Sequence, residues 1–317
     1  RLRKAGLLVD VRVLFAQPTL AALAGAAGIG HEVKVPANRV PTQAERIIPS
    51  MLSLIELDQA AIDDIVATVP GGAANVQEIY PLAPLQEGIL YHHLSAEQGD
   101  PYLLQTRLAF DSVERLLAWA GALQQVIDRH DILRTAVLWQ GLAQPLQVVW
   151  RKAELLVSEI DDLADDDGRA RVEQLHARFD ARHHRLDLTQ APLTRLYYSL
   201  DPANQQVVAI LLFHHLTLDH TAMDVVAREM RALLFGQGHT LPAAVPYRNY
   251  VAQARLGDQA GHEAFFREML ADVEEPTLPL GYADVQGDGR GIETAFQALD
   301  GEVAHGLRTQ ARQLGVS

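Results

Sequence analysis

An unbroken apolar run at residues 207–213 constrains the fold of this chain more than its other patterns do. Strands that are buried on both faces carry such runs, so residues 207–213 predict the central strand of a sheet. The run passes directly into a polar segment from His214 to His220, and the helical periodicity of residues 221–235 follows. Polar side chains are therefore expected at the end of a central strand, where a sheet can present them to a ligand.

Strands and helices alternate through the middle of the chain. Residues 103–110 alternate in polarity as a strand does, and residues 113–129 have the period of an amphipathic helix. Residues 136–150 predict a hairpin with a Gln-Gly turn, and residues 193–200 predict a further strand. The fold class is accordingly α+β, with helices packed on a largely antiparallel sheet.

The two ends of the chain differ from this pattern. Residues 1–30 contain two short helical signals, the second opened by Pro18. Residues 28–74 are rich in proline and predict a linker with one ordered element, a helix at 59–69. Residues 303–314 predict a helix just before the last residue, and the first residue is not methionine. We expect the chain to be a piece of a longer polypeptide.

Composition excludes several classes of function. A formal net charge of -13 disfavours a nucleic-acid backbone or an anionic membrane surface as partner. The absence of cysteine excludes disulfides, thiolate metal sites and a cysteine nucleophile. We find no Gly-x-Ser-x-Gly elbow, no phosphate-binding loop and no dinucleotide fingerprint. No apolar run is long enough to span a bilayer, so the cytoplasm is the expected compartment.

The polar segment after the central strand holds three histidines and an aspartate. If the strand continues through His214 and His215, their side chains point to opposite faces and cannot bind one ion, which argues against a metal site. One of the two is then expected to face a cleft while the other packs inside. From the residues alone, a structural histidine is the alternative to a catalytic one.

The same segment resembles the His-His-x-x-x-Asp-Gly signature of nonribosomal peptide synthetase condensation domains, and here it is HHLTLDH. His220 stands where the signature has glycine, so the loop after Asp219 is expected to differ in shape. Three further segments resemble this family, namely residues 80–90 (YPLAPLQEGIL), 129–135 (RHDILRT) and 247–250 (YRNY). The resemblance implies a chloramphenicol-acetyltransferase-like fold, in a family in which two such lobes form a V around a reaction tunnel.

The resemblance also implies roles for single residues. His215 would hold the acceptor amine and take up its proton as a peptide bond forms, with His214 beside it in the catalytic motif. Asp219 would organise the loop, and Arg134 is expected to be its ion-pair partner. The other site-organising positions are Arg129, Gln86 and Tyr247.

Residues 91–100 (YHHLSAEQGD) resemble the extra motif of dual condensation and epimerisation domains, which invert the donor residue before joining it. The matching positions are His92, His93, Gly99 and Asp100. In this interpretation His215 takes part in moving the α-proton, and the segment with the two histidines shapes or supplies the second proton-transfer group. The alternative is an exposed loop whose histidines are only hydrated.

The opening residues resemble the last helices of a peptidyl carrier domain, without the serine that bears 4′-phosphopantetheine. We therefore expect a carrier remnant at 1–28, an interdomain linker at 29–76, the N-terminal condensation lobe at 77–272, and a crossing segment with the start of the C-terminal lobe at 273–317. The implied partners are an upstream carrier domain with the donor, a downstream carrier domain with the acceptor, and a neighbouring adenylation domain. Phosphopantetheine on those carriers is the expected cofactor, and no metal, nucleic acid or membrane is expected.

Two alternatives stay open. A condensation domain that joins residues without inversion would make the match at residues 91–100 incidental. A non-catalytic docking domain of the same fold would recruit a partner enzyme to a carrier-bound peptide. The replacement of glycine by His220 favours the second alternative, whereas the presence of His215 disfavours it.

Overall fold

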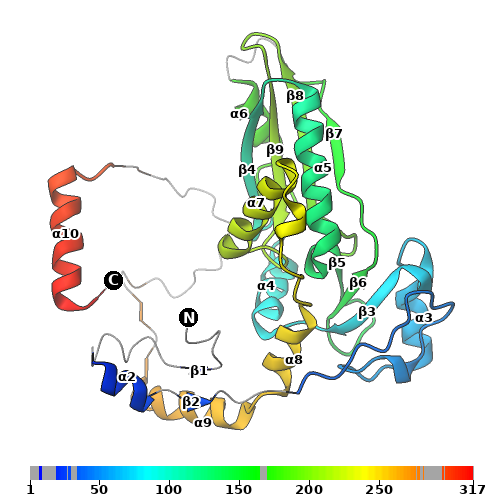
Figure 1. Ribbon diagram of the computed structural model, residues 1–317, viewed down its shortest axis with the longest axis vertical. Coiled ribbons are helices and arrows are strands. Elements are labelled where there is room, and N and C mark those ends of the chain that lie inside the picture. Colours follow the sequence, from blue (N-terminus) through cyan, green and yellow to red (C-terminus); the bar gives the residue numbers. More distant parts are fainter. Residues whose placement is uncertain are drawn as a thin grey trace. The chain divides into compact units, whose positions relative to one another are not determined.

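The three-dimensional description rests on a computed structural model of the chain (Figure 1). The structure describes residues 7–8, 19–26, 28–29, 34–164, 170–275, 277–278, 281, 295 and 297–316. By its internal contacts the chain divides into two compact units, Val35–Asp288 and the combination of Arg1–Lys34 with Gly289–Ser317.

The larger unit is built on a four-stranded sheet with the strand order β4-β9-β8-β7. Its strands are β4 (Leu103–Phe110), β7 (Leu156–Glu159), β8 (Thr194–Asp201) and β9 (Gln206–His214). β9 pairs antiparallel with β4 and with β8, whereas β7 and β8 are parallel. β9 is thus an inner strand, as its unbroken apolar sequence predicts, and the predicted α+β class with a largely antiparallel sheet is confirmed.

Helices cover both faces of this sheet (Figure 1). They are α5 (Val113–Arg129), α6 (Arg171–Arg178) and α7 (His220–Leu234). Successive side chains of a strand point to opposite faces, so Leu211 and Phe213 pack with α5 and α7, while Ile210 and Leu212 pack with α6. His214 is the next position on the α6 side of this alternation, which places it at the buried end of β9.

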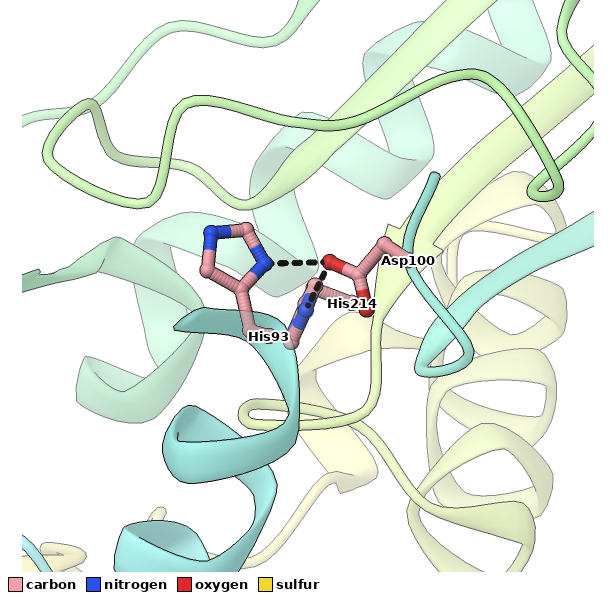
Figure 2. A group of neighbouring side chains, drawn as sticks. All are labelled: His93, Asp100 and His214. Atoms are coloured by element: carbon pink, nitrogen blue, oxygen red, sulfur yellow. Dashed lines mark hydrogen bonds and ion pairs between the residues drawn. The ribbon is translucent and has the colours of Figure 1, made fainter. Parts of the chain in front are cut away.

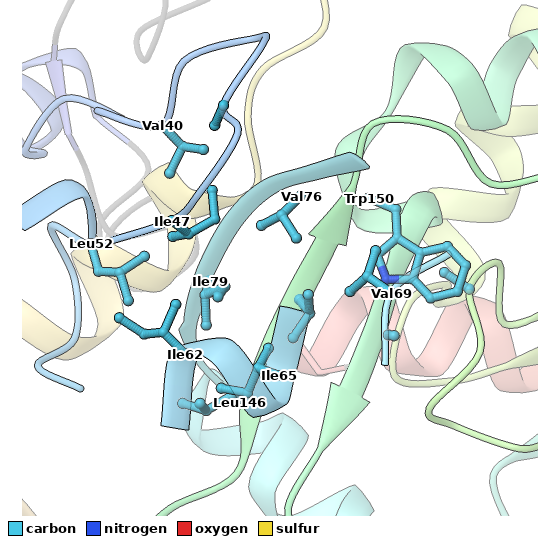
Figure 3. Packing of buried hydrophobic residues seen from close by; sticks show 14 of the residues in the cluster. Val40, Ile47, Leu52, Ile62, Ile65, Val69, Val76, Ile79, Leu146 and Trp150 are labelled. Carbon is cyan, nitrogen blue, oxygen red and sulfur yellow. The ribbon is translucent and has the colours of Figure 1, made fainter. Parts of the chain in front are cut away.

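A second, three-stranded sheet has the order β3-β6-β5, and both of its strand pairs are antiparallel. Its strands are β3 (Val76–Pro81), β5 (Thr135–Leu138) and β6 (Leu146–Trp150). The helix α3 (Gln59–Ala67) lies over this sheet, and its Ile62 and Ile65 point toward Ile79 and Leu146 (Figure 3). Asp58 begins α3 by accepting the Ala61 N–H at 2.8 Å.

The segment that precedes α3 belongs to the same hydrophobic core. Val40, Ile47, Leu52 and Ile55 are all buried and cluster with residues of α3 and β3 (Figure 3). Ile47 is only 1% exposed, so this part of the predicted linker packs into the core of the larger unit from Val40 onward.

The remaining elements are helices and one short strand pair. In the larger unit they are α4 (Pro84–Ser95), α8 (Arg248–Leu256), α9 (Gln259–Met269) and the 3-10 turns Pro49–Met51, Gly72–Asn75, Asp131–Arg134 and Gly238–Thr240. The smaller unit contains α2 (Leu20–Ala26), α10 (Gly301–Leu314) and a two-residue antiparallel pair of β1 (Leu7–Leu8) with β2 (Gly28–Ile29). In the described part of the chain, no helix is long and apolar enough to cross a membrane.

Most predicted elements are confirmed. β4 and α5 have the predicted bounds, and the predicted hairpin corresponds to β5 and β6. The predicted helices at 59–69, 221–235 and 303–314 correspond to α3, α7 and α10. Of the two helical signals near the start of the chain, the second is α2, and the first lies outside the described residues.

Candidate active site

The polar segment after β9 forms a tight turn and then begins α7. The backbone N–H groups of Thr217 and Leu218 donate to the carbonyl oxygen of His214 at 3.1 and 3.3 Å. Asp219 is the N-cap of α7, and its carboxylate accepts the N–H of Ala222 at 2.6 Å. Asp219 therefore fixes the start of the helix, as an N-cap aspartate does.

His220 occupies the first turn of α7. Among the described residues other than glycine, only Gln205 has a positive φ, so the backbone at residue 220 adopts a conformation open to any residue. In this chain the position does not need the freedom of glycine, and a loop shape different from that of the glycine-containing signature stays a prediction.

His214 is fully buried, and its two ring nitrogens have different partners. Nδ1 lies 3.1 Å from the backbone nitrogen of Leu216, whose N–H can only donate. Nδ1 must then accept, which places the ring proton of neutral His214 on Nε2. Nε2 lies 2.9 Å from Oδ2 of Asp100 and donates to it.

Asp100 joins three donors in the interior, and Figure 2 shows the two that are histidines. Its Oδ2 lies 2.6 Å from Nδ1 of His93, at the end of α4, and 2.9 Å from Nε2 of His214, at the end of β9. Its Oδ1 accepts the backbone N–H of Tyr102 at 2.9 Å. Burial acts to raise the pKa of this carboxyl, but the hydrogen bonds from the two histidines and the amide outweigh it and hold the pKa well below its ordinary value.

The ligand atoms of His93, Asp100 and His214 all lie within 4.8 Å of one another, a spacing that invites comparison with a metal site. The tautomer of His214 argues against that function. If Nε2 bound a cation while Nδ1 accepted from Leu216, neither ring nitrogen could bear a proton. The neutral imidazole would have to give up its one N–H proton and become an imidazolate. The three side chains fit a hydrogen-bonded triad and do not fit a divalent metal.

His215 lies just beyond β9 and is partly exposed. Its backbone N–H donates to the carbonyl oxygen of Tyr102 at 3.0 Å, and its Nδ1 lies 2.8 Å from the carbonyl oxygen of Leu218. Because a carbonyl can only accept, Nδ1 bears the proton and Nε2 of the neutral ring has a free lone pair. In the described part of the chain, no hydrogen bond engages this Nε2. His215 thus presents a proton acceptor with a fixed tautomer.

The two histidines at the end of α4 have different surroundings. The buried face of this helix contains Gln86, Ile89, Leu90 and His93, so His93 points into the protein by the helical period. His92 is partly exposed, and its ring centroid lies 5.9 Å from that of Tyr102. The alternative of an exposed, merely hydrated loop is wrong, since this segment is helical and one of its histidines is buried.

Gly99 has a structural reason to be glycine. Its φ is +67°, and a β-carbon there would lie 2.3 Å from the carbonyl oxygen of Ala181. The next residue, Asp100, donates its backbone N–H to the same carbonyl at 2.7 Å. The Gly-Asp pair therefore brings the chain close to Ala181 and aims the Asp100 carboxylate at the two buried histidines.

The expected pairing of Arg134 with Asp219 is wrong. The guanidinium of Arg134 donates to the carbonyl oxygens of Ile127 and Trp150 and to the side chain of Gln77. In the described residues, no ion pair within 4.0 Å joins it to Asp219, whose carboxylate caps α7 instead. Arg134 holds the backbone at the end of α5 and of β6 and makes no hydrogen bond to the turn after β9 among the described residues.

Two other predicted organising residues do reach the region of the loop. Gln86 donates from Nε2 to the carbonyl oxygen of Leu216 at 2.9 Å and thereby ties α4 to the turn after β9. Arg129 donates to Glu229 of α7 at 3.0 Å and so links α5 to the helix that follows the turn. Tyr247 donates its backbone N–H to both carboxylate oxygens of Asp131, at 3.0 and 3.1 Å. Burial chiefly raises the pKa of its phenol, and the charges of Tyr250 and Asp219 add to this effect.

Comparison with known proteins identifies the family. The family model for the condensation domain matches residues 76–317. This chain belongs to the condensation domain family. The condensation domain of the monacolin K polyketide synthase MokA has the same fold at 18% identity, with a TM-score of 0.55 over 77% of this chain and 57% of that chain. The predicted chloramphenicol-acetyltransferase-like fold is thereby confirmed.

Several curated proteins contain a segment similar to this condensation domain. Malpinin synthetase of Mortierella alpina is 49% identical over 100% of this chain and 4% of its own length. Malpibaldin synthetase of the same organism is 43% identical over 100% of this chain and 6% of its own length. The chain thus spans only a small part of these relatives.

The sequence did not single out Tyr102 or Leu218 as parts of this condensation domain's site. Each acts through a backbone carbonyl that holds His215, and a backbone carbonyl leaves no signature in side-chain identity. The position of Tyr102 directly before a predicted strand was the only available signal.

Proposed function

We propose that this chain carries the donor-side part of a nonribosomal peptide synthetase condensation domain. It would join a peptidyl thioester on an upstream carrier domain to an aminoacyl amine on a downstream carrier domain. The observation that carries this proposal is the imidazole of His215, which is partly exposed, held in one tautomer and left with a free Nε2 lone pair. Family membership and the similarity to malpinin synthetase and malpibaldin synthetase support it.

In this mechanism Nε2 of His215 accepts a hydrogen bond from the acceptor amine. An α-amino group has a pKa of about 7.7 to 8.0, so part of it is already neutral near pH 7 and no strong base is needed for attack. As the C–N bond forms and the C–S bond breaks, the amine proton passes to Nε2, and the thiolate leaves on its phosphopantetheine arm. General base catalysis of this kind contributes about 10²- to 10⁴-fold.

The triad of His93, Asp100 and His214 would position this imidazole without touching substrate. Asp100 fixes Tyr102 through its amide, and the Tyr102 carbonyl in turn holds the backbone of His215. His214 belongs to the same turn and is locked between Asp100 and Leu216. Precise placement of the reacting groups matters here because both substrates are tethered.

We further propose that the domain inverts the donor residue before condensation. Removal of the α-proton of a peptidyl thioester gives an enolate, and return of a proton to the opposite face gives the other enantiomer. His215 would act on one face. Of the two neighbouring histidines, His92 is the candidate for the other face, because it is partly exposed whereas His93 is buried and bonded to Asp100.

The proposed domain organisation follows the same assignment. The carrier remnant, linker, N-terminal lobe and start of the C-terminal lobe would occupy residues 1–28, 29–76, 77–272 and 273–317. Both carrier domains and an adenylation domain would be partners, in the cytoplasm. Their phosphopantetheine arms bring the two substrates, and no metal is assigned a role.

A stereochemical assay tests both parts of the proposal. The complete synthetase would receive a carrier-bound donor of known handedness and an acceptor, and the dipeptide would be resolved by chiral chromatography. We expect a dipeptide with an inverted donor residue from the unmodified protein. We expect His92→Ala to retain condensation and lose inversion. A dipeptide of unchanged handedness from the unmodified protein would exclude epimerisation, and no dipeptide at all would exclude the condensation function.

A further inference from the structure

Tyr102 connects the two histidine motifs of the site through its backbone. Its N–H donates to Oδ1 of Asp100 at 2.9 Å, and its carbonyl oxygen accepts the N–H of His215 at 3.0 Å. It lies directly before β4, whose first residue Leu103 pairs with His214 across the sheet. The residue therefore sits between the buried triad and the imidazole with the free lone pair.

The ring of Tyr102 lies against both partly exposed histidines. Its centroid is 6.2 Å from that of His215, and the two ring planes differ by only 13°. On the side of α4, the ring of His92 lies 5.9 Å away at an interplanar angle of 41°. Both distances are in the range at which aromatic rings attract each other. In the described part of the chain, no hydrogen bond engages the Tyr102 hydroxyl. The side chain packs against a buried cluster that includes Leu90 and Leu216, and its ring meets the two imidazoles.

The contacts of His215 explain why such a ring would matter. The backbone N–H and Nδ1 of His215 are each fixed by one carbonyl oxygen. A single hydrogen bond to Nδ1 leaves the ring free to tilt about the line that joins the two atoms, and a tilt moves Nε2. A parallel aromatic face removes that freedom, because tilting the imidazole would separate the two rings or drive them into contact.

We propose that Tyr102 is a positioning residue of this site. Its ring sets the plane of the His215 imidazole and separates this imidazole from the imidazole of His92. The proposal deepens the condensation function and rests on it for its kinetic consequences. A displacement of about 1 Å in a reacting group costs about 10²-fold in rate, so loss of the ring face should lower the rate by about 10- to 100-fold.

The kinetic test compares Tyr102→Leu with Tyr102→Phe in the complete synthetase, with both carriers loaded beforehand. We expect Tyr102→Phe to form dipeptide within about threefold of the unmodified rate, because phenylalanine keeps the ring face. We expect Tyr102→Leu to lose about 10- to 100-fold in single-turnover rate, with the acceptor concentration for half-maximal rate changed less than about twofold. Tyr91→Leu is the control for condensation, because Tyr91 is exposed and its ring contacts that of His92, at a centroid distance of 5.5 Å. Among the described residues it has no ring contact with His215, so the condensation rate should stay unchanged.

A second readout does not depend on activity. The NMR signals of the His215 ring protons are assigned in the proton–carbon spectrum by their loss in His215→Ala. Their chemical shifts should change clearly in Tyr102→Leu, because the ring current of Tyr102 is lost, and much less in Tyr102→Phe. Unchanged His215 shifts in a folded Tyr102→Leu protein would overturn the proposal. Equal rate losses in the leucine and phenylalanine variants would also overturn it, by assigning the effect to the hydroxyl. An unmodified protein that forms no dipeptide but shows the expected shifts would reject the proposed function and keep the positioning role.

Discussion

Replacing Asp100 by asparagine should lower the free energy of unfolding of this chain by about 3 kcal/mol at pH 7. The side chain is buried and accepts from three donors, at 2.6, 2.9 and 2.9 Å. An asparagine oxygen can keep the Tyr102 amide, but its NH₂ group then faces Nε2–H of His214. His214 cannot change its tautomer, because its Nδ1 already accepts from Leu216. A buried donor without an acceptor costs about 1–3 kcal/mol, and loss of the charged acceptor adds to this.

The pH dependence of the same variant gives a second check. The pKa of Asp100 is lowered in the folded protein by hydrogen bonds that outweigh its burial. The contribution of Asp100 to the free energy of unfolding is therefore complete above about pH 3.9, the pKa of an aspartate in the unfolded chain. This contribution is lost as the pH falls through the lower pKa of the folded state. Urea denaturation should show a difference between the two proteins that is constant near pH 7 and shrinks below about pH 4.

The matched control is Asp111→Asn, because Asp111 is 81% exposed and, among the residues that the structure describes, pairs only with Arg115 at the surface. We expect a change of less than about 0.5 kcal/mol for this control. If Asp100→Asn changed the stability as little as the control does, the assignment of a charged acceptor at the centre of the triad would be refuted.

Three further predictions concern the frame around the site. Gly99→Ala should destabilise the chain by about 2 kcal/mol or more in urea denaturation, because φ is +67° and a β-carbon would meet a carbonyl oxygen. The control Gly121→Ala, in the exposed part of α5, should be neutral or stabilise the chain by up to about 1 kcal/mol. Equal effects of the two substitutions on stability would contradict the geometry at Gly99. Glu78→Gln should cost about 3 kcal/mol because Arg248 would lose its buried ionic partner, and a midpoint unchanged in urea would rule out that ion pair. Gln86→Ala should lower the dipeptide rate about tenfold by releasing the turn after β9, and a rate equal to that of the unmodified protein would disprove this link.

The elements that carry the site were predictable because local pattern decides them. The apolar run of β9 and the alternation of β4 gave the correct strands, and the two strands are neighbours in the sheet. The inward direction of His93 was also within reach of the sequence, since it follows Gln86 and Ile89 at the spacing of one helical face. The helix was not predicted there because residues 84–95 mix apolar and polar side chains around its circumference.

The contacts that define the site were not predictable in the same way. Asp100 meets His214 across 114 positions of sequence, and no local pattern encodes such a pairing. The error about Arg134 has a similar origin, because its acceptors are mainly backbone carbonyls and only a neighbouring carboxylate can be guessed from residue types. The fixed tautomers of His214 and His215 follow from backbone groups in the same way.

The most direct test of the account is the single-turnover rate of dipeptide formation by His215→Ala in the complete synthetase with both carriers loaded beforehand. The free Nε2 lone pair of His215 predicts a loss of at least about 10²-fold, with the circular dichroism spectrum and thermal midpoint unchanged. A rate within about threefold of that of the unmodified protein would show that this imidazole does not take part in the reaction, and it would contradict the assignment of the site.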